Sequence, residues 1–235
     1  MENTREFYVR EYYEFLLERM SDESRFQKYR IKNVIDLAVP MEGEKILDLG
    51  TAIGTFSFKC ANLGCQVVGL DFSEESIKIC KYRAEKQGFD SNNPHFVVGD
   101  ATSMEFRDNS FDKIICADLT EHLFPDMQEK LIKECKRVLK NGGKLIIFTP
   151  SPTHIIDRLR SKNFILKKFD EHVAVMPMEH YIDLLTSNGF RIIKKYFVQT
   201  HYPVISNIEK FLSRIPYISN LFQRRICILA EVIKL

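Results

Sequence analysis

Short apolar runs alternate with amphipathic stretches through most of the chain. The apolar runs are continuous, which is typical of strands whose two faces are both covered by helices. They predict strands at residues 45–49, 66–70, 95–98, 111–117 and 144–149. The stretches between them repeat apolar residues at helical spacing and predict helices at 54–63, 74–87 and 126–139. Strands that alternate with helices indicate an α/β fold with a doubly wound, mostly parallel sheet.

Both ends of the chain depart from this alternation. Residues 6–39 predict two helices that Pro40 ends, and we expect residues 1–40 to form an N-terminal helical cap. We expect residues 41–235 to form one further domain. Its later elements are an insert at 150–177, a helix at 178–188, strands at 190–199 and 226–234, and a long connection at 200–225. The last two strands lack a crossover helix between them, which predicts an antiparallel hairpin at the edge of a seven-stranded sheet.

An acid stands at the end of four successive predicted strands: Asp48, Asp71, Asp100 and Asp118. In an open parallel sheet, ligands bind outside the carboxyl ends of the strands, near the point where the strand order reverses. The first acid is followed by a turn, Gly50 to Gly54, that leads into a helix, and glycines in such a turn let a ligand approach the backbone closely. We therefore expect the four acids to surround one ligand that carries positive charge and several hydrogen-bond donors.

Two nucleotide-like ligands compete for this site. A dinucleotide requires the sequence G-x-G-x-x-G, whose backbone amides hold a pyrophosphate. In this chain Ala52 replaces the middle glycine of the turn, and the carboxylate of Asp48 would repel a pyrophosphate. S-adenosylmethionine suits the turn better, because it has no phosphate and carries a sulfonium and an ammonium cation. An acid about 20 residues further on, here Asp71, can accept hydrogen bonds from ribose hydroxyls.

At these residues the chain resembles the class I S-adenosylmethionine-dependent methyltransferases, over about residues 25–200. Residues 47–54 are similar to the family's first motif, D-x-G-x-G-x-G, and residues 139–147 are similar to its L-x-P-G-G strand entry, with Asn141 in place of proline. The resemblance implies a Rossmann-like fold, S-adenosylmethionine as the cofactor and methyl transfer as the reaction (EC 2.1.1.-). The cofactor-binding residues that it implies are Asp48, Gly50, Thr51, Gly54, Asp71, Phe72, Asp100, Ala101, Asp118 and Leu119.

The resemblance also implies that these residues contact different parts of the cofactor. Asp71 should bind the ribose hydroxyls, and Phe72 should pack on the adenine. Asp100 should accept a hydrogen bond from the adenine amino group, next to a backbone amide from the following residue. Asp118, with the leucine that follows it, should border the methionine end. The family's reaction is an in-line attack on the sulfonium methyl group, in which holding the acceptor close and aligned can supply most of the catalysis.

The segment after the fourth predicted strand is where the family places groups that face the acceptor. Its Glu121-His122 pair resembles the L-E-H segment of small-molecule members, including the ubiquinone- and menaquinone-type enzymes, and differs from the N/D-P-P-Y/F segment of nucleic-acid methyltransferases. We therefore expect a small-molecule acceptor, with O- or N-methylation favoured. His122 is a candidate catalytic base, because histidine exchanges protons near neutral pH, but it can equally anchor its loop. His172 in the insert is the second catalytic candidate.

Composition and charge narrow the classes of partner. The chain has 34 Lys and Arg against 32 Asp and Glu, so its formal net charge of +2 provides no global attraction for nucleic acid. Histidine spacings typical of metal sites, H-x-x-x-H and H-E-x-x-H, do not occur, and we expect no metal. No apolar run approaches the roughly 18 residues of a membrane span. The six cysteines form no C-x-x-C pair, and we expect buried free thiols in a reducing cytoplasm.

Residues 205–225 are unusually long for the connection of an edge hairpin. Apolar residues that share a helical face here are Ile208, Phe211, Leu212 and Ile215. Positive charge comes from Lys210, Arg214, Arg224 and Arg225. Two interpretations stay open: a helix packed on its own domain, and an interfacial patch that meets a membrane peripherally or binds a lipid-linked substrate.

Two other functions stay open from the sequence. The departures from the family motifs at Ala52 and Asn141 permit a binding module that keeps S-adenosylmethionine but lacks the chemistry. An NAD-dependent oxidoreductase is a more distant alternative, because the pyrophosphate turn is incomplete. The N-terminal helices should close the acceptor side, where candidate pocket residues are Tyr12, Tyr13, Arg25 and Arg30.

Overall fold

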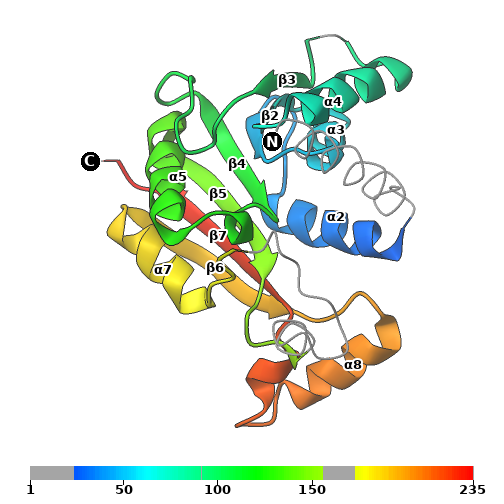
Figure 1. The fold of residues 1–235 in the computed structure, drawn as a ribbon, viewed down its shortest axis with the longest axis vertical. Helices are drawn as coiled ribbons and strands as arrows, with labels where there is room; N and C mark the ends of the chain where they lie inside the picture. The colour runs from blue at the N-terminus through cyan, green and yellow to red at the C-terminus, as the bar shows by residue number, and fades with distance from the viewer. Residues whose placement is uncertain (1–23, 91, 156–172, 235) are drawn as a thin grey trace, which may run out of the picture.

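A seven-stranded sheet forms the centre of the molecule (Figure 1). The computed structural model describes residues 24–90, 92–155 and 173–234. The strands are β1 (Lys45–Leu49), β2 (Gln66–Asp71), β3 (His95–Val98), β4 (Phe111–Ala117), β5 (Leu139–Pro150), β6 (Phe190–Val198) and β7 (Arg225–Val232). Their order is β3-β2-β1-β4-β5-β7-β6; the first five are parallel, and β7 is antiparallel to both of its neighbours. This confirms the predicted Rossmann-like, mostly parallel sheet with an antiparallel edge.

The helices begin and end close to the predicted positions. They are α2 (Arg25–Ala38), α3 (Thr55–Ala61), α4 (Glu74–Lys86), α5 (Pro125–Val138), α7 (Met178–Ser187) and α8 (Pro203–Leu212), with the short 3-10 helices η1 (Thr120–His122) and η2 (Ser219–Phe222). Ser73 caps α4 by accepting a hydrogen bond from the amide of Ser76 at 3.2 Å, and Gly88 follows that helix with a left-handed φ of 72°. The first helix predicted within 6–39, and most of the insert, lie outside the described residues.

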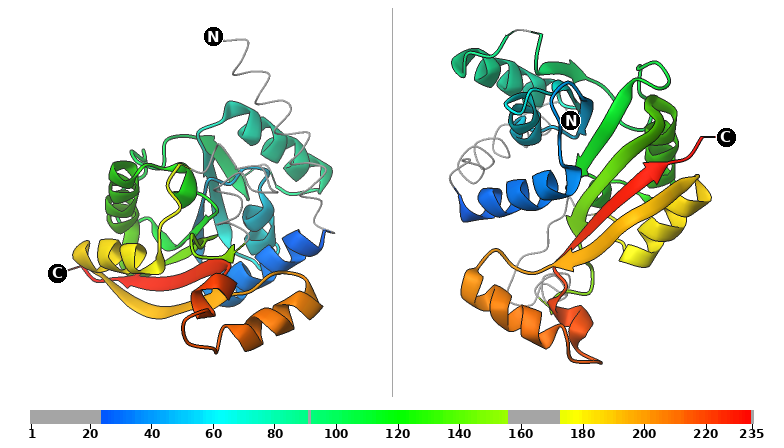
Figure 2. Two further views of the ribbon diagram at one scale, coloured as in Figure 1. Left: turned by 60° about the horizontal axis from the view of Figure 1, so that its bottom comes forward. Right: turned by 180° about the vertical axis from the view of Figure 1, so that it is seen from behind.

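Successive side chains of the central strands point to opposite faces and join two separate cores. On β5, Leu145 and Ile147 belong to the core with α5 and α7, whereas Ile146 and Phe148 belong to the core with α2 and α3. A third, smaller cluster around Phe58 joins α4 to α3. Helices therefore cover both sides of the sheet, as the views in Figure 2 show. This double cover explains why the central strands are continuous apolar runs.

Asn141, Gly142 and Gly143, which precede the strand predicted at 144–149, lie inside β5. β5 begins at Leu139, directly after α5, and pairs there with Phe111 of β4. The pairing then shifts register before it resumes at Lys144, so the three residues form an irregularity inside the strand. Gly142 has a left-handed φ of 75°, a conformation that serves a bulge as well as a turn. The glycine pair in the sequence is therefore compatible with both a tight turn and a bulge.

α2 lies against the sheet rather than apart from it. Its Val34 and Leu37 are buried in the same core as Phe148 of β5. Tyr29 of α2 also donates a hydrogen bond to the backbone carbonyl of Gln199, just beyond β6. The division of the chain into an N-terminal helical cap and a second domain stays a prediction.

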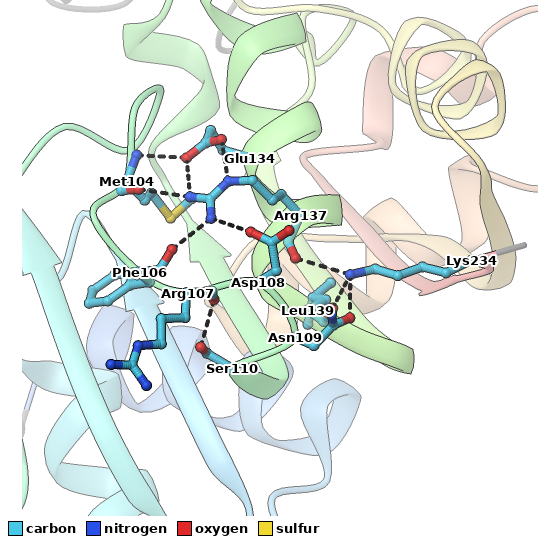
Figure 3. A network of polar contacts seen from close by, with 10 residues as sticks. All are labelled: Met104, Phe106, Arg107, Asp108, Asn109, Ser110, Glu134, Arg137, Leu139 and Lys234. Carbon is cyan, nitrogen blue, oxygen red and sulfur yellow. Dashed lines mark hydrogen bonds and ion pairs between the residues drawn. The ribbon is translucent and has the colours of Figure 1, made fainter.

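Arg137, near the end of α5, holds the loop between β3 and β4 (Figure 3). Its guanidinium donates to both carboxylate oxygens of Glu134 and to Asp108, each at 2.8 Å. It also donates to the carbonyl oxygens of Met104 at 2.7 Å and Phe106 at 2.6 Å. These hydrogen bonds from Arg137 lower the pKa of the Glu134 carboxyl. This loop directly follows β3 and carries Asp100, the third of the four strand-end acids.

Replacement of Arg137 by alanine should therefore destabilise the protein. We expect Arg137→Ala to lower the free energy of unfolding by about 1.5–3 kcal/mol, because it removes charge-assisted hydrogen bonds and leaves two loop carbonyls without their donor. Urea denaturation followed by circular dichroism measures the change. The control Lys133→Ala breaks an exposed ion pair with Glu129 on the same helix and should cost less than about 0.5 kcal/mol. Equal losses in the two variants would contradict the role of Arg137 as a clamp.

Candidate functional site

The carboxyl ends of the first four strands bring the strand-end acids to one edge of the sheet. β1 and β4 are neighbours, and the chain winds outward from this pair in opposite directions, so the strand order reverses between them. Such a switch point is where open α/β sheets bind their ligands. The registers place Asp48 of β1 beside Ile115 of β4, and Asp71 of β2 beside Val98 of β3. The four acids share this edge, but their surroundings differ.

Asp48 is buried and holds the glycine turn together. Its Oδ2 accepts hydrogen bonds from the hydroxyl of Thr51 at 2.8 Å, and from the amide and hydroxyl of Ser57 at 3.1 and 2.7 Å. Burial raises the pKa of Asp48 to about 6, although these hydrogen bonds oppose the rise. The carboxyl group therefore shapes the turn from inside the protein.

Asp71 joins the glycine turn to the end of β2. One of its carboxylate oxygens accepts from the amide of Ala52 at 2.9 Å, and the other accepts from the amide of Ser73 at 3.0 Å. Ala52, which replaces the middle glycine of the motif, has a φ of 49°, in the left-handed region that glycine prefers. The hydrogen bond to Asp71 supports this conformation. The turn thus follows a glycine-like path although it contains an alanine.

The outer part of this edge offers an exposed aromatic ring between two acids. Phe72 directly follows Asp71 and is 73% exposed. On the neighbouring strand, the amide of Gly99 donates to the carbonyl of Asp71 at 2.9 Å, which brings Asp100 alongside. Asp100 is exposed, and its Oδ1 accepts from the amide and hydroxyl of Thr102 at 2.7 and 2.8 Å. A ring available for stacking and an exposed carboxylate match the chemistry of an adenine nucleoside.

Two glycines let the turn pass close to its neighbours. Gly50 and Gly54 have left-handed φ values of 65° and 81°. A Cβ at Gly50 would lie 3.2 Å from the side chain of Leu119, and a Cβ at Gly54 would lie 2.7 Å from the ring of Phe58. Leu119 follows the end of β4, so the ends of the first and fourth strands meet at Gly50. Ala101, the remaining predicted contact, is half-buried against the core of the sheet.

Two arginines neutralise Asp118 beyond the end of β4. Arg30 of α2 donates from Nε to Oδ2 at 2.7 Å, and Arg225 of β7 donates to Oδ1. Burial opposes the ionisation of Asp118, but the two guanidiniums outweigh it and lower its pKa. Asp118 also has a left-handed φ of 55°, which is uncommon for a residue with a side chain. Asp118 therefore offers no uncompensated negative charge to a cationic ligand. This differs from the expectation that all four strand-end acids surround such a ligand.

A series of hydroxyl groups leads to the buried carboxyl of Glu121. The hydroxyl of Thr120 donates to that of Thr149 at 3.0 Å, which donates in turn to Glu121 at 3.1 Å. Because the proton of Thr120 is engaged in this way, the Tyr181 hydroxyl, 3.0 Å away, is the donor to Thr120. Burial, followed by the nearby charge of Asp118, raises the pKa of Glu121 to about 7. This carboxyl therefore changes its charge near neutral pH.

His122, the first catalytic candidate, ends η1 and is half-exposed beside the buried Glu121. A protonated His122 attracts the carboxylates of Asp118 and Glu121 and favours their ionised forms. The second catalytic candidate, His172, lies outside the described residues, as do the candidate pocket tyrosines of the N-terminal segment. The structure therefore brings one of the two candidate bases to the edge that carries the acids.

Sequence reasoning named Arg30 as a candidate pocket residue, but it missed that Arg30 and Arg225 pair with Asp118. Arg225 stands 107 positions from Asp118, and Arg30 stands 88 positions from it, so no local pattern links them. Thr149 and Tyr181 are likewise remote from Glu121 in the chain. One signal was available, because Arg225 directly precedes the last apolar strand. A charge that enters a buried strand needs a partner.

A surface pocket at the opposite end of the strands is separate from this site. Lys136, Thr186 and Lys234 are among its lining residues, at the edge where β6 begins and β7 ends. None of the four strand-end acids lines it. Among the described residues, no three His, Cys, Asp or Glu side chains are grouped so that they could hold a metal ion.

Comparison with protein sequences shows relatives of one functional class. A family model described as "Methyltransferase domain" matches residues 40–198. A demethylmenaquinone methyltransferase from Thermotoga maritima is 35% identical over 139 residues, which cover 58% of this chain and 56% of that protein. A ubiquinone biosynthesis O-methyltransferase from Coxiella burnetii is 35% identical over 115 residues, which cover 49% of this chain and 47% of that protein. The chain thus spans about half the length of these curated relatives.

Comparison with solved structures shows the same fold over nearly the whole chain. A methyltransferase from Archaeoglobus fulgidus, described as dependent on S-adenosylmethionine, has a TM-score of 0.71 at 22% identity, and the match covers 94% of this chain and 99% of that one. A geranyl diphosphate methyltransferase in complex with S-adenosylmethionine has a TM-score of 0.67 at 14% identity, with coverage of 89% and 86%. At these identities the likeness shows the fold alone, whereas the family model matches well over half of the chain. The chain therefore belongs to the class I S-adenosylmethionine-dependent methyltransferase family.

Proposed function

We propose that this protein transfers the methyl group of S-adenosylmethionine to a ring hydroxyl of a small, apolar acceptor of the quinone class. The observation that carries the proposal is the division of one sheet edge into two parts. Phe72 and Asp100 are exposed beside buried Asp71 and suit a nucleoside. In the other part, the imidazole of His122 stands next to Glu121, and burial raises the pKa of the Glu121 carboxyl to about 7. The printed names of the relatives, demethylmenaquinone methyltransferase and ubiquinone biosynthesis O-methyltransferase, support the acceptor class.

The residues of the nucleoside part fit this cofactor. Asp71 would bind the ribose hydroxyls, Phe72 would stack on the adenine, and Asp100 would accept from the adenine amino group. The glycine turn would face the methionine part with its backbone. We assign cofactor contact or support to Asp48, Gly50, Thr51, Gly54, Asp71, Phe72, Asp100, Ala101, Asp118 and Leu119. When bound, S-adenosylmethionine supplies a sulfonium methyl group, which the acceptor oxygen receives as it loses its proton, leaving a neutral thioether.

The acceptor part has to orient a hydroxyl group and take its proton. His122 would accept that proton, and the ionised form of the neighbouring Glu121 carboxyl would stabilise the resulting imidazolium. A base in this position typically contributes about 10²–10⁴-fold to the rate, and alignment of the acceptor contributes more. His172 stays a second candidate for the same role.

We place this reaction in the cytoplasm. All six cysteines are free and buried, and burial raises the pKa of the Cys116 thiol well above its usual range. Cysteines that form no disulfide bond are typical of proteins in a reducing compartment, which supports this placement.

The nucleoside assignment predicts a loss of cofactor affinity in Asp100→Asn. The variant should bind S-adenosylmethionine about tenfold more weakly, because an acceptor oxygen becomes a donor group opposite the adenine amino group. Isothermal titration measures the affinity. The control Asp126→Asn, an exposed acid in the first turn of α5, should bind like the wild type. Absence of heat with the wild type would refute the cofactor, and equal affinity in Asp100→Asn would refute the role of Asp100.

The base assignment predicts a loss of rate in His122→Gln. With labelled S-adenosylmethionine and a catechol that carries a short prenyl chain, kcat should fall by about 100-fold, because the acceptor proton loses its base. The KM for the cofactor should stay within about twofold of the wild-type value. The control His95→Gln changes an exposed histidine on β3 and should leave the rate unaltered. A rate in His122→Gln within threefold of the wild type would exclude His122 as the base.

The raised pKa of Glu121 predicts a particular dependence of stability on pH. Between the usual value of 4.5 and about 7, the unfolded carboxyl ionises while the buried one stays protonated, so wild-type stability should fall as pH rises through this window. Glu121→Gln has no such proton, so its stability relative to the wild type should rise over the same window, by on the order of 3 kcal/mol. Urea denaturation at several pH values measures this. Parallel curves for Glu121→Gln and the exposed control Glu129→Gln would contradict the prediction.

A further inference from the structure

We propose that α8 and the segment after it dock on the surface of a bilayer that contains anionic lipid. The surface in question, called here the α8 surface, consists of Val204, Ile205, Ile208, Phe211, Ile215 and Tyr217, all of them exposed. The inference goes beyond methyl transfer and stands without it, because it rests on the exposure and the charge of residues in and around α8. Five observations carry it: apolar exposure, an inverted helix face, the sign of the charge, the dimensions of α8 and the position of the surface.

The apolar exposure of the α8 surface follows a helical stripe. Val204, Ile208 and Phe211 of α8 are spaced four and three positions apart, which is the period of one face of a helix, and Ile215 follows just beyond the end of the helix. In a soluble domain such a stripe normally faces the core. Here Val204 is 73% exposed and Phe211 is 66% exposed. Contiguous apolar exposure of this kind marks a surface that binds a partner or a membrane.

The opposite face of α8 anchors the helix through polar groups. Glu209 is buried, and its carboxylate accepts a hydrogen bond from the amide of Thr200 at 2.7 Å. Its other oxygen lies 3.2 Å from Nε2 of the fully buried His154. The helix therefore turns its one acidic residue inward, whereas the apolar residues of the α8 surface face outward. This arrangement is the inverse of an ordinary amphipathic helix. The inward side is fixed by hydrogen bonds to Glu209, so the orientation that exposes the apolar side chains is specified by the fold.

The charge of the segment favours an anionic bilayer over a neutral apolar partner. Glu209 is the one acid among residues 200–225, and it is buried. Lys210 and Arg214 are exposed, and neither has an ion pair with any residue that the structure describes. An apolar surface flanked by exposed cations and free of exposed acid complements the headgroups of anionic lipids.

The dimensions of α8 suit an interfacial position. The helix has ten residues, and within the described part of the chain no helix is long and apolar enough to cross a bilayer. Tyr217 is fully exposed in the segment that follows, and Tyr202 is exposed just before the helix begins. Tyrosine is enriched at the level of lipid headgroups, where its ring is apolar and its hydroxyl is hydrated.

The α8 surface lies at the same edge of the sheet as the candidate site. α8 connects the end of β6 to the start of β7, and it lies at the bottom of the view in Figure 1. Arg225, the first residue of β7, pairs with Pro150 at the end of β5 and contacts Asp118 beyond the end of β4. Docking through α8 would therefore turn the acceptor part of the site toward the bilayer, where an apolar acceptor dissolves.

Vesicle sedimentation with the full chain tests the proposal. The wild type should sediment with vesicles of phosphatidylcholine and phosphatidylglycerol more than with phosphatidylcholine alone, and less at high salt. Ile208→Ser/Phe211→Ser should reduce the bound fraction at least about fivefold. Lys210→Gln/Arg214→Gln should remove the preference for the anionic vesicles. The control Met41→Ser/Ile193→Ser changes two exposed apolar side chains elsewhere and should bind like the wild type.

The outcomes separate this inference from its rivals. Unchanged sedimentation of Ile208→Ser/Phe211→Ser would overturn it. So would a wild type that does not sediment but forms a dimer that this variant loses, because the surface would then meet a second copy of the chain. Unaltered circular dichroism and cofactor affinity would show that the variant is folded. Vesicle binding without methyl transfer to any acceptor would refute the proposed function and leave this inference standing.

Discussion

The ion pairs between Asp118, Arg30 and Arg225 are the interaction on which the arrangement of the site depends. They join α2, β4 and β7, which are remote in sequence, at the point where the strand order reverses. A buried charge is costly unless it is paired, so removal of one member would leave the others uncompensated. The same charges act on Glu121, whose carboxyl lies 4.0 Å from Arg225. The charges and pKa values in the acceptor part of the edge therefore depend on residues from three separate elements.

The two parts of the edge are built on different physical principles. The nucleoside part is held by hydrogen bonds from backbone amides and hydroxyls to Asp48 and Asp71, and burial raises the pKa of both carboxyls. The acceptor part is held by full charges, and there the pKa of Asp118 is lowered while that of Glu121 is raised. Two carboxyls separated by three positions therefore differ in charge near neutral pH. Such divergence between neighbouring acids is typical of sites that move protons.

Local patterns were sufficient for most of the fold because the strands are buried on both faces. The bounds of β3 and β4 agree with the apolar runs at 95–98 and 111–117. The bulge in β5 could not be told from a turn, since Gly142 serves both. The edge that carries the four acids was predictable, because parallel strands share a direction. The partners of Asp118 were not, because pairings across 88 and 107 positions depend on packing that no local pattern records.

The burial of all six cysteines has a practical consequence for spectroscopy. Thiol reagents act on thiolates that solvent can reach, and these thiols are buried, with pKa values that burial raises for residues such as Cys65 and Cys227. The native chain should therefore stay unlabelled by maleimides while it is folded. A cysteine introduced at Val204 would supply one accessible attachment point without prior removal of any native thiol. A dye attached there would sense the polarity around α8 directly.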